Sequence, residues 1–196
     1  MGISVITPPA VEPITILGLN GESGLKKHVN EALDVTDSDG LLTAYCTVAW
    51  DYAENYTWRS LITRSLRLTL PYWRTRVVLP RPKILTVASV EYYDENEALQ
   101  TLPAADWRID LNEAVAELHI LDFPATFDRL DAVRINYTSG YGTTAAAFPP
   151  CLLHAVRLLV GSSFSVRESA SSERNTADRL LDTLSVCDDP RLAEFE

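Results

Sequence analysis

The stretch LITRSLRLTL, residues 61–70, decides the fold, because the spacing of the apolar residues changes there. Leucine occupies every second position from Leu66 to Leu70, and Arg67 and Thr69 lie between. This alternation predicts a strand with one buried face. Upstream, in residues 39–56, apolar side chains recur at spacings of three and four, which predicts a helix with a broad apolar face. The residues of this apolar stripe are Leu41, Leu42, Tyr45, Cys46, Ala49, Tyr52, Ala53 and Tyr56. The chain therefore passes from helix to sheet near residue 61.

The segment downstream of residue 70 continues as short strands separated by turns. Pro80 and Pro82 interrupt the strand pattern, and the acidic stretch at residues 94–97 predicts a hairpin turn. The connections are too short for helical crossovers, so we expect an antiparallel sheet of five or six short strands. Residues 76–79 are predicted to continue the first strand briefly, and the further predicted strands cover residues 84–93, 99–102, 107–109, 115–121 and 132–138.

Helices are predicted on both sides of this sheet. Residues 22–33 predict a first helix, and a third helix begins at the proline pair before Cys151. Residues 169–174 are polar and serine-rich and predict a mobile loop, followed by a short helix over residues 175–184. The order predicts an α+β protein: a helical core of two N-terminal and two C-terminal helices with an inserted antiparallel β-sheet region.

Four segments follow from this division. Residues 1–20 carry three prolines and predict an extended N-terminal arm. Residues 21–60 are the first part of the helical core, and residues 61–143 are the inserted β-region. Residues 149–196 are the second part of the helical core and include a short C-terminal segment.

The composition is that of a globular protein, and its charge limits the partners. The chain has 196 residues, 46% of them hydrophobic, and a formal net charge of −10. This charge argues against broad binding to nucleic acid or to anionic membranes. The three cysteines are isolated, and residues 1–6 lack the basic segment of a signal peptide. We therefore expect a cytoplasmic protein with free thiols and no contact with membranes.

No motif predicts a cofactor, a metal ion or a catalytic residue. His28, His119 and His154 lack metal-ligand spacing, and no phosphate-binding loop is present. Acidic residues gather around the predicted hairpins, and two of them in a cleft could serve a carboxylate-dependent hydrolase. This alternative would use Asp94, Glu95, Asp106 or Asp110.

Basic and aromatic side chains gather at the start of the β-region. In a protein of net charge −10, such a cluster favours contact with an acidic surface of another subunit or neighbouring protein. A weaker alternative is a platform for single-stranded nucleic acid, on which bases would stack. The residues for protein contacts are Arg64, Arg67, Tyr72, Trp73, Arg74 and Arg76; the nucleic-acid alternative uses the last four.

The order of several short motifs resembles one known family. The motifs are LL (residues 41–42), AENYT (53–57), LIT (61–63), LTLPYW (68–73), VLPRP (78–82), VASVEYYD (87–94), YTSGYG (137–142) and FPP (148–150). Their succession over residues 25–185 resembles the head-to-tail connector proteins of long-tailed double-stranded-DNA phages, prophages and gene transfer agents. These proteins are also called head-completion or adaptor proteins.

The resemblance implies a structural protein without catalytic activity or cofactor. Such a protein would be assembled in the host cytoplasm into the virion neck as a ring, usually of twelve copies. The ring would lie between the portal protein and a stopper or tail-completion protein and would extend the channel through which DNA passes without specific binding. By position, the C-terminal segment would dock on the portal. Its candidate docking residues are Arg179, Leu180, Leu184, Arg191, Leu192 and Phe195.

Overall fold

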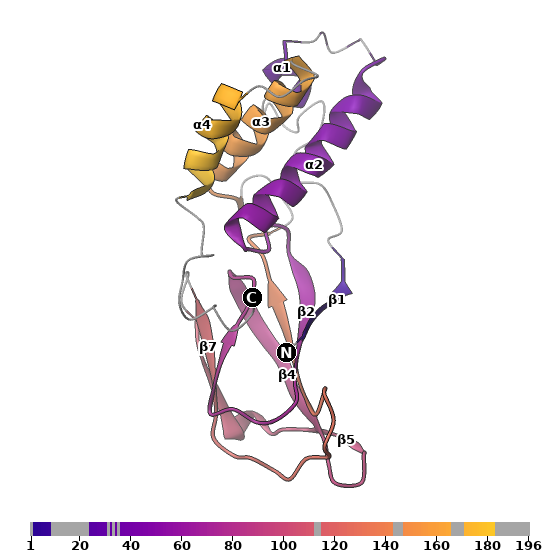
Figure 1. Ribbon diagram of the computed structural model, residues 1–196, viewed down its shortest axis with the longest axis vertical. Helices are drawn as coiled ribbons and strands as arrows, with labels where there is room; N and C mark the ends of the chain where they lie inside the picture. Colours follow the sequence, from indigo (N-terminus) through magenta and orange to yellow (C-terminus); the bar gives the residue numbers. More distant parts are fainter. Residues whose placement is uncertain are drawn as a thin grey trace. The chain divides into compact units, whose positions relative to one another are not determined.

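The computed structural model describes residues 2–8, 24–30, 32, 34, 36–111, 115–142, 147–165 and 171–182 (Figure 1). The described residues form two compact units. We call them the β unit, which contains residues 2–8 and the described part of 59–141, and the helical unit, which contains the described residues of 24–58 and 142–182. The protein is α+β, as the sequence predicts, with two helices before and two after all of its strands except the first.

The β unit contains two antiparallel sheets. The larger sheet has the strand order β1-β2-β8-β4-β5, and the smaller sheet has the order β3-β7-β6. The strands of the larger sheet are β1 (Gly2–Thr7), β2 (Arg64–Leu70), β4 (Ile84–Tyr93), β5 (Leu99–Thr101) and β8 (Val133–Ser139). Those of the smaller sheet are β3 (Arg76–Leu79), β6 (Trp107–Asp110) and β7 (Ala116–Ile120), and a 3₁₀ turn, η1 (Ala104–Asp106), precedes β6.

Apolar residues of both sheets form one core. In β2 and β8 every second residue is buried, and the buried residues include Leu68 and Ile135. They share a cluster with Val77 of β3 and Leu118 of β7. The prediction of a single sheet was therefore wrong. The apolar face of the larger sheet needs a cover, and the smaller sheet supplies one because its own strands also bury apolar residues.

The predicted N-terminal arm contributes a strand to the larger sheet. Residues Gly2–Thr7 form β1, which pairs antiparallel with β2, and Ile3 lies opposite Leu68. All six residues of β1 are exposed. Residues Gly2–Thr7 of the predicted arm thus form an edge strand of the chain's own larger sheet, and the rest of the arm beyond residue 8 lies outside the described residues.

The helical unit is built around α2 (Asp39–Thr57), which the period-3.6 pattern predicts within one residue. It contains also α1 (Leu25–His28), α3 (Pro150–Ser165) and α4 (Ser171–Asp182). On α2 the predicted stripe is buried at four positions, while Leu41 is exposed. Trp50 is also buried, and its ring centroid lies 5.4 Å from that of Phe148. The buried residues of α2 and α3 are Leu42, Cys46, Ala49, Trp50, Ala53, Thr57, Leu152, Ala155, Val156, Leu159, Val160 and Ser162.

The first helix is shorter than the predicted span of residues 22–33. It ends at His28, and Asn30 adopts a left-handed conformation with φ of 59°, which stops the helix. Lys26 is fully buried, and its Nζ lies 2.6 Å from Oδ1 of Asp39. An ion pair therefore connects α1 to α2.

The last helix begins earlier than predicted. The polar segment expected as a mobile loop over residues 169–174 contributes its residues from Ser171 onward to α4. Ala177 and Leu181 are fully buried and fix the helix at two points one turn apart. Once these side chains are packed, extending the helix by a turn costs little, because each added residue gains a backbone hydrogen bond. Among the described helices, none is long and apolar enough to cross a membrane.

Candidate interaction surfaces

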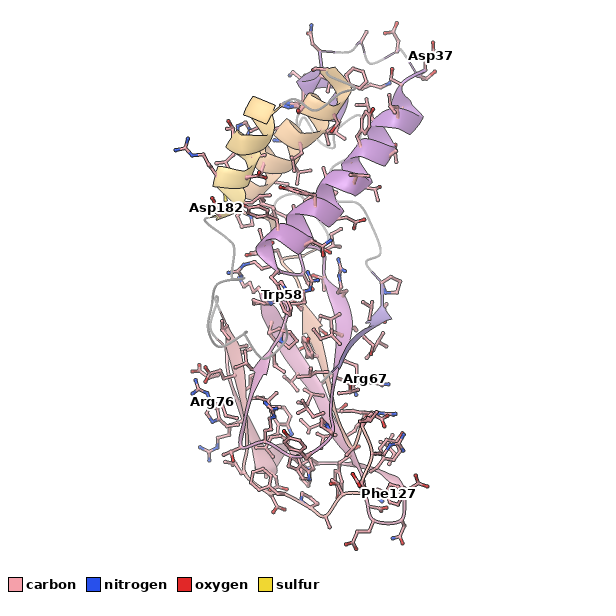
Figure 2. The ribbon with its side chains drawn as sticks, viewed as in Figure 1. Asp37, Trp58, Arg67, Arg76, Phe127 and Asp182 are labelled. Carbon is pink, nitrogen blue, oxygen red and sulfur yellow. The ribbon has the colours of Figure 1, made fainter. Side chains whose placement is uncertain are left out.

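Arg67 belongs to a polar network on the face of the larger sheet opposite the core (Figure 2). Its Nε donates to Oδ1 of Asn136 at 2.8 Å, and Nδ2 of Asn136 lies 2.8 Å from both Ser89 Oγ and Glu91 Oε1. Three neighbouring strands contribute these side chains. The arrangement holds Arg67 in one orientation, so this face presents a fixed pattern of polar groups.

Arg64 and Arg76 are also engaged within the chain. Nε of Arg64 lies 3.5 Å from the carbonyl oxygen of Ile62. Arg76 is half exposed and binds the carboxylate of Glu117 through two nitrogens, with Nε 2.6 Å from Oε2. Glu117 is nearly buried, and the bidentate geometry suits the planar guanidinium. The two sheet arginines, Arg67 and Arg76, therefore have partners in their own chain.

Tyr72, Trp73 and Arg74 lie in the turn between β2 and β3. Trp73 packs inward: its Nε1 donates to the carbonyl oxygen of Pro124 at 2.7 Å, and its ring centroid lies 5.5 Å from that of Tyr92. Tyr72 is exposed, and the guanidinium carbon of Arg74 lies 5.5 Å from its ring centroid. Stacking of a nucleic-acid base would need an exposed aromatic ring. Of the two aromatic residues, only Tyr72 is exposed.

On α4, two of the predicted docking residues are described. Arg179 is exposed and Leu180 is half-buried. The other four, Leu184, Arg191, Leu192 and Phe195, lie outside the described residues.

Two tyrosines of α2 hold α4 in place. The hydroxyl of Tyr52 donates to Oδ1 of Asp178 at 2.7 Å, and that of Tyr56 donates to Oδ1 of Asp182 at 2.6 Å. The two pairs are one helical turn apart on both helices. The hydrogen bond to Asp182 raises the pKa of Tyr56 to about 12. The sequence analysis placed both tyrosines in an apolar stripe and did not predict these hydrogen bonds. The missed signal is that the two tyrosines and the two aspartates have the same spacing of four residues.

The acids of the hydrolase alternative lie on separate elements. Asp94 and Glu95 are in the β4–β5 turn, Asp106 ends η1 and Asp110 ends β6. The carboxylate of Asp94 accepts hydrogen bonds from the side chain of Gln100 and from two backbone amides, which lower its pKa. This carboxylate therefore stays ionised and serves the turn. In the described part of the chain, no group of three or more metal-ligating side chains converges.

No protein-family profile matches this chain, and no curated protein sequence matches it. Chains of solved structures do match it, and three of them are the following. A chain in the neck of an empty GTA particle, computed with C6 symmetry, is 24% identical, with a TM-score of 0.74 over 94% of this chain and 95% of that chain. A chain in the virion of a native gene transfer agent (GTA) particle is 22% identical, with a TM-score of 0.71 and the same coverage. A chain in the neck of a native GTA particle, computed with C12 symmetry, is 23% identical, with a TM-score of 0.71 and again the same coverage. The resemblance drawn from the sequence motifs is thus confirmed at the level of the fold.

Proposed function

We propose that this chain is a structural protein of a virion neck that assembles as a ring between a portal protein and a stopper or tail-completion protein. The observation that carries the proposal is the likeness to chains of GTA necks over 94% of this chain and 95% of theirs. Coverage so complete in both directions means that both units of the chain have counterparts there, and not only a common supersecondary motif. A structural role needs no catalytic group, and the proposal assigns none.

The symmetry of the similar particles supports a ring. Their necks were computed with C6 and C12 symmetry, and a chain that repeats around such an axis must present two different surfaces to its neighbours. We propose twelve copies for this chain. The residues proposed for contacts between subunits or with other neck proteins are Arg64, Arg67, Tyr72, Trp73, Arg74 and Arg76, among which Tyr72 is the most exposed aromatic residue.

Portal docking is proposed for α4 and the segment after it. The bonds from Tyr52 and Tyr56 fix α4 on α2, so Arg179 projects from a supported helix. A preorganised helix loses little conformational entropy on docking, which favours affinity. The net charge of −10 is compatible with a channel through which DNA moves without binding.

Mass measurement tests the proposal directly. The purified chain, alone and mixed with the portal protein of the same virion, is analysed by native mass spectrometry over a range of concentrations. We expect a ring, or a ring that forms on the portal. The Arg179→Glu variant should bind the portal at least about tenfold more weakly, whereas Arg179→Lys, which keeps the charge, should bind like the wild type. A chain that stays monomeric and does not bind the portal protein at high concentration would refute the proposal.

A further inference from the structure

Four connections lie together at one end of the β unit. β2 ends at Leu70, directly opposite Val133, where β8 begins. β4 ends in the same row of the sheet, since Tyr92 also pairs with Val133, and the other sheet closes there with Trp107 opposite Ile120. We call this the loop end; it consists of residues 71–75, 94–98, 102–106 and 121–132.

Exposed apolar side chains concentrate at the loop end. Of the thirteen large apolar residues that are exposed in the described part of the chain, six lie in these loops or directly beside them. Figure 2 shows Phe127 at this end of the β unit. A monomeric soluble protein seldom gathers so many at one place without a binding role. They are Leu130 (88% exposed), Tyr72 (57%), Leu121 (54%), Leu99 (49%), Phe123 (45%) and Phe127 (38%).

The longest of the loops, residues 121–132, is fixed at its first half by Trp73. The indole donates to the carbonyl oxygen of Pro124 at 2.7 Å, and its ring centroid lies 6.3 Å from that of Phe123. Trp73 packs in turn against the core of the β unit. The exposed ring of Phe123 is therefore held from below.

The second half of the same loop is fixed by Tyr93. The amide of Phe127 donates to the carbonyl oxygen of Tyr93 at 3.1 Å, and the guanidinium carbon of Arg129 lies 3.8 Å from the centre of the tyrosine ring. Asp131 accepts hydrogen bonds from Arg129 and Arg134, which lower its pKa. A loop of twelve residues without helix or strand is unusual unless it has a function, and this one is ordered before any partner arrives.

The loop end is strongly acidic. Its four segments contain seven acidic and two basic residues, and one of the basic residues, Arg129, is already bound to Asp131. Glu95, Glu97, Asp122 and Asp128 are exposed around the apolar side chains. The surface therefore combines aromatic and aliphatic residues at its centre with acids at its rim, the layout of a protein-binding surface.

We propose that the loop end is the docking surface for a second virion protein whose contact surface is apolar at its centre and basic at its rim. The acidic rim of the loop end favours a partner protein with a basic contact surface. DNA phosphates would be repelled by the acids, and so would the loop end of another copy of this chain. The inference rests on the proposed function, because it takes the chain to be part of a virion, but it uses a different surface from the one proposed for portal docking.

Particle assembly tests the proposal. A producer strain that lacks the wild-type gene is complemented with Leu130→Asp or with Asp128→Lys, and gene delivery by the released particles is measured. Both positions are exposed, so the fold should persist. The control variants are Leu130→Met, which keeps an apolar side chain, and Val48→Asp, which changes an exposed apolar residue of α2 (65% exposed).

We expect both loop-end variants to form the ring and bind the portal like the wild type, while gene delivery falls at least about tenfold, the loss expected when a central contact of an interface is removed. Leu130→Met and Val48→Asp should deliver normally. Delivery by both loop-end variants within twofold of the wild type would overturn the inference. Failure of the wild-type chain to form a ring or bind the portal would overturn the proposed function instead, so the two failures are distinguishable.

Discussion

Replacing Gly140 by alanine should destabilise the β unit severely. Gly140 follows β8 with φ of +132°, a conformation that side chains with a Cβ rarely adopt. A Cβ built there would lie 2.6 Å from both Cα and N of Thr63 and 2.7 Å from the carbonyl carbon of Ile62. These atoms belong to the backbone, so no rotation of a side chain relieves the contact. The two segments must move apart.

The loss in free energy of unfolding follows from the hydrogen bonds that this movement breaks. The amide of Gly140 donates to Lys83 O and the amide of Tyr141 donates to Leu61 O, both at 2.9 Å. Each bond contributes about 1 kcal/mol, and the strained φ adds about 1–3 kcal/mol. The free energy of unfolding should therefore fall by about 3–5 kcal/mol, a large share of the stability of an ordinary domain.

Gly40→Ala is the matched control. Gly40 lies in the first turn of α2, and a Cβ there would meet nothing within 4 Å. The same substitution should stabilise α2 by about 0.5–1 kcal/mol, because alanine loses less backbone entropy in a helix. Chemical denaturation gives the free energies, and hydrogen exchange measured on peptides of β8 and α2 shows which unit changes. A Gly140→Ala protein as stable as the wild type would refute the reasoning.

Three further predictions concern individual side chains. The difference in free energy of unfolding between the wild type and Tyr56→Phe should be constant below pH 10 and vanish as the pH rises to about 12. The reason is that the hydrogen bond to Asp182 favours the protonated phenol. Denaturation at a series of pH values measures this difference. Tyr137→Phe should cost about 1–2 kcal/mol in thermal unfolding, since it removes a buried 3.0 Å hydrogen bond to Pro80 O, and an unchanged melting temperature would contradict this. The stability that Asp131 contributes relative to Asp131→Asn should be complete at neutral pH and be lost as the pH falls below 3.8, because its two arginine partners favour the ionised carboxylate. Acid unfolding of both proteins, followed by circular dichroism, tests the direction of this change.

Local periodicity predicted most of the elements. Alternation over residues 64–70 and 133–139 reflects the two faces of a strand, and the spacing of three and four in α2 reflects one face of a helix, so both are visible in a single segment. The turns were equally local: Asp94 accepts hydrogen bonds from amides only two and four residues away. The α+β class follows from these signals in their order along the chain.

The candidate surfaces were harder to predict, because they depend on residues that are distant in the sequence. Trp73 was assigned to a contact surface, yet its indole bonds to Pro124, 51 residues later. Tyr52 and Tyr56 bond to aspartates 126 residues away. The loop end was not predicted at all, since it exists only where the ends of β2, β4 and β7 meet.

The sequence by itself therefore determined which segments are strands and helices, the acidic character of the protein and the resemblance to connector proteins. Only the tertiary structure decided that β3 pairs with β7 in a second sheet, that Gly2–Thr7 joins β2, and that the exposed aromatic residues gather at one end. The physical reason is that an element's type depends on its own side-chain period, whereas its partner is chosen by the hydrogen bonds and the apolar burial that distant segments offer it.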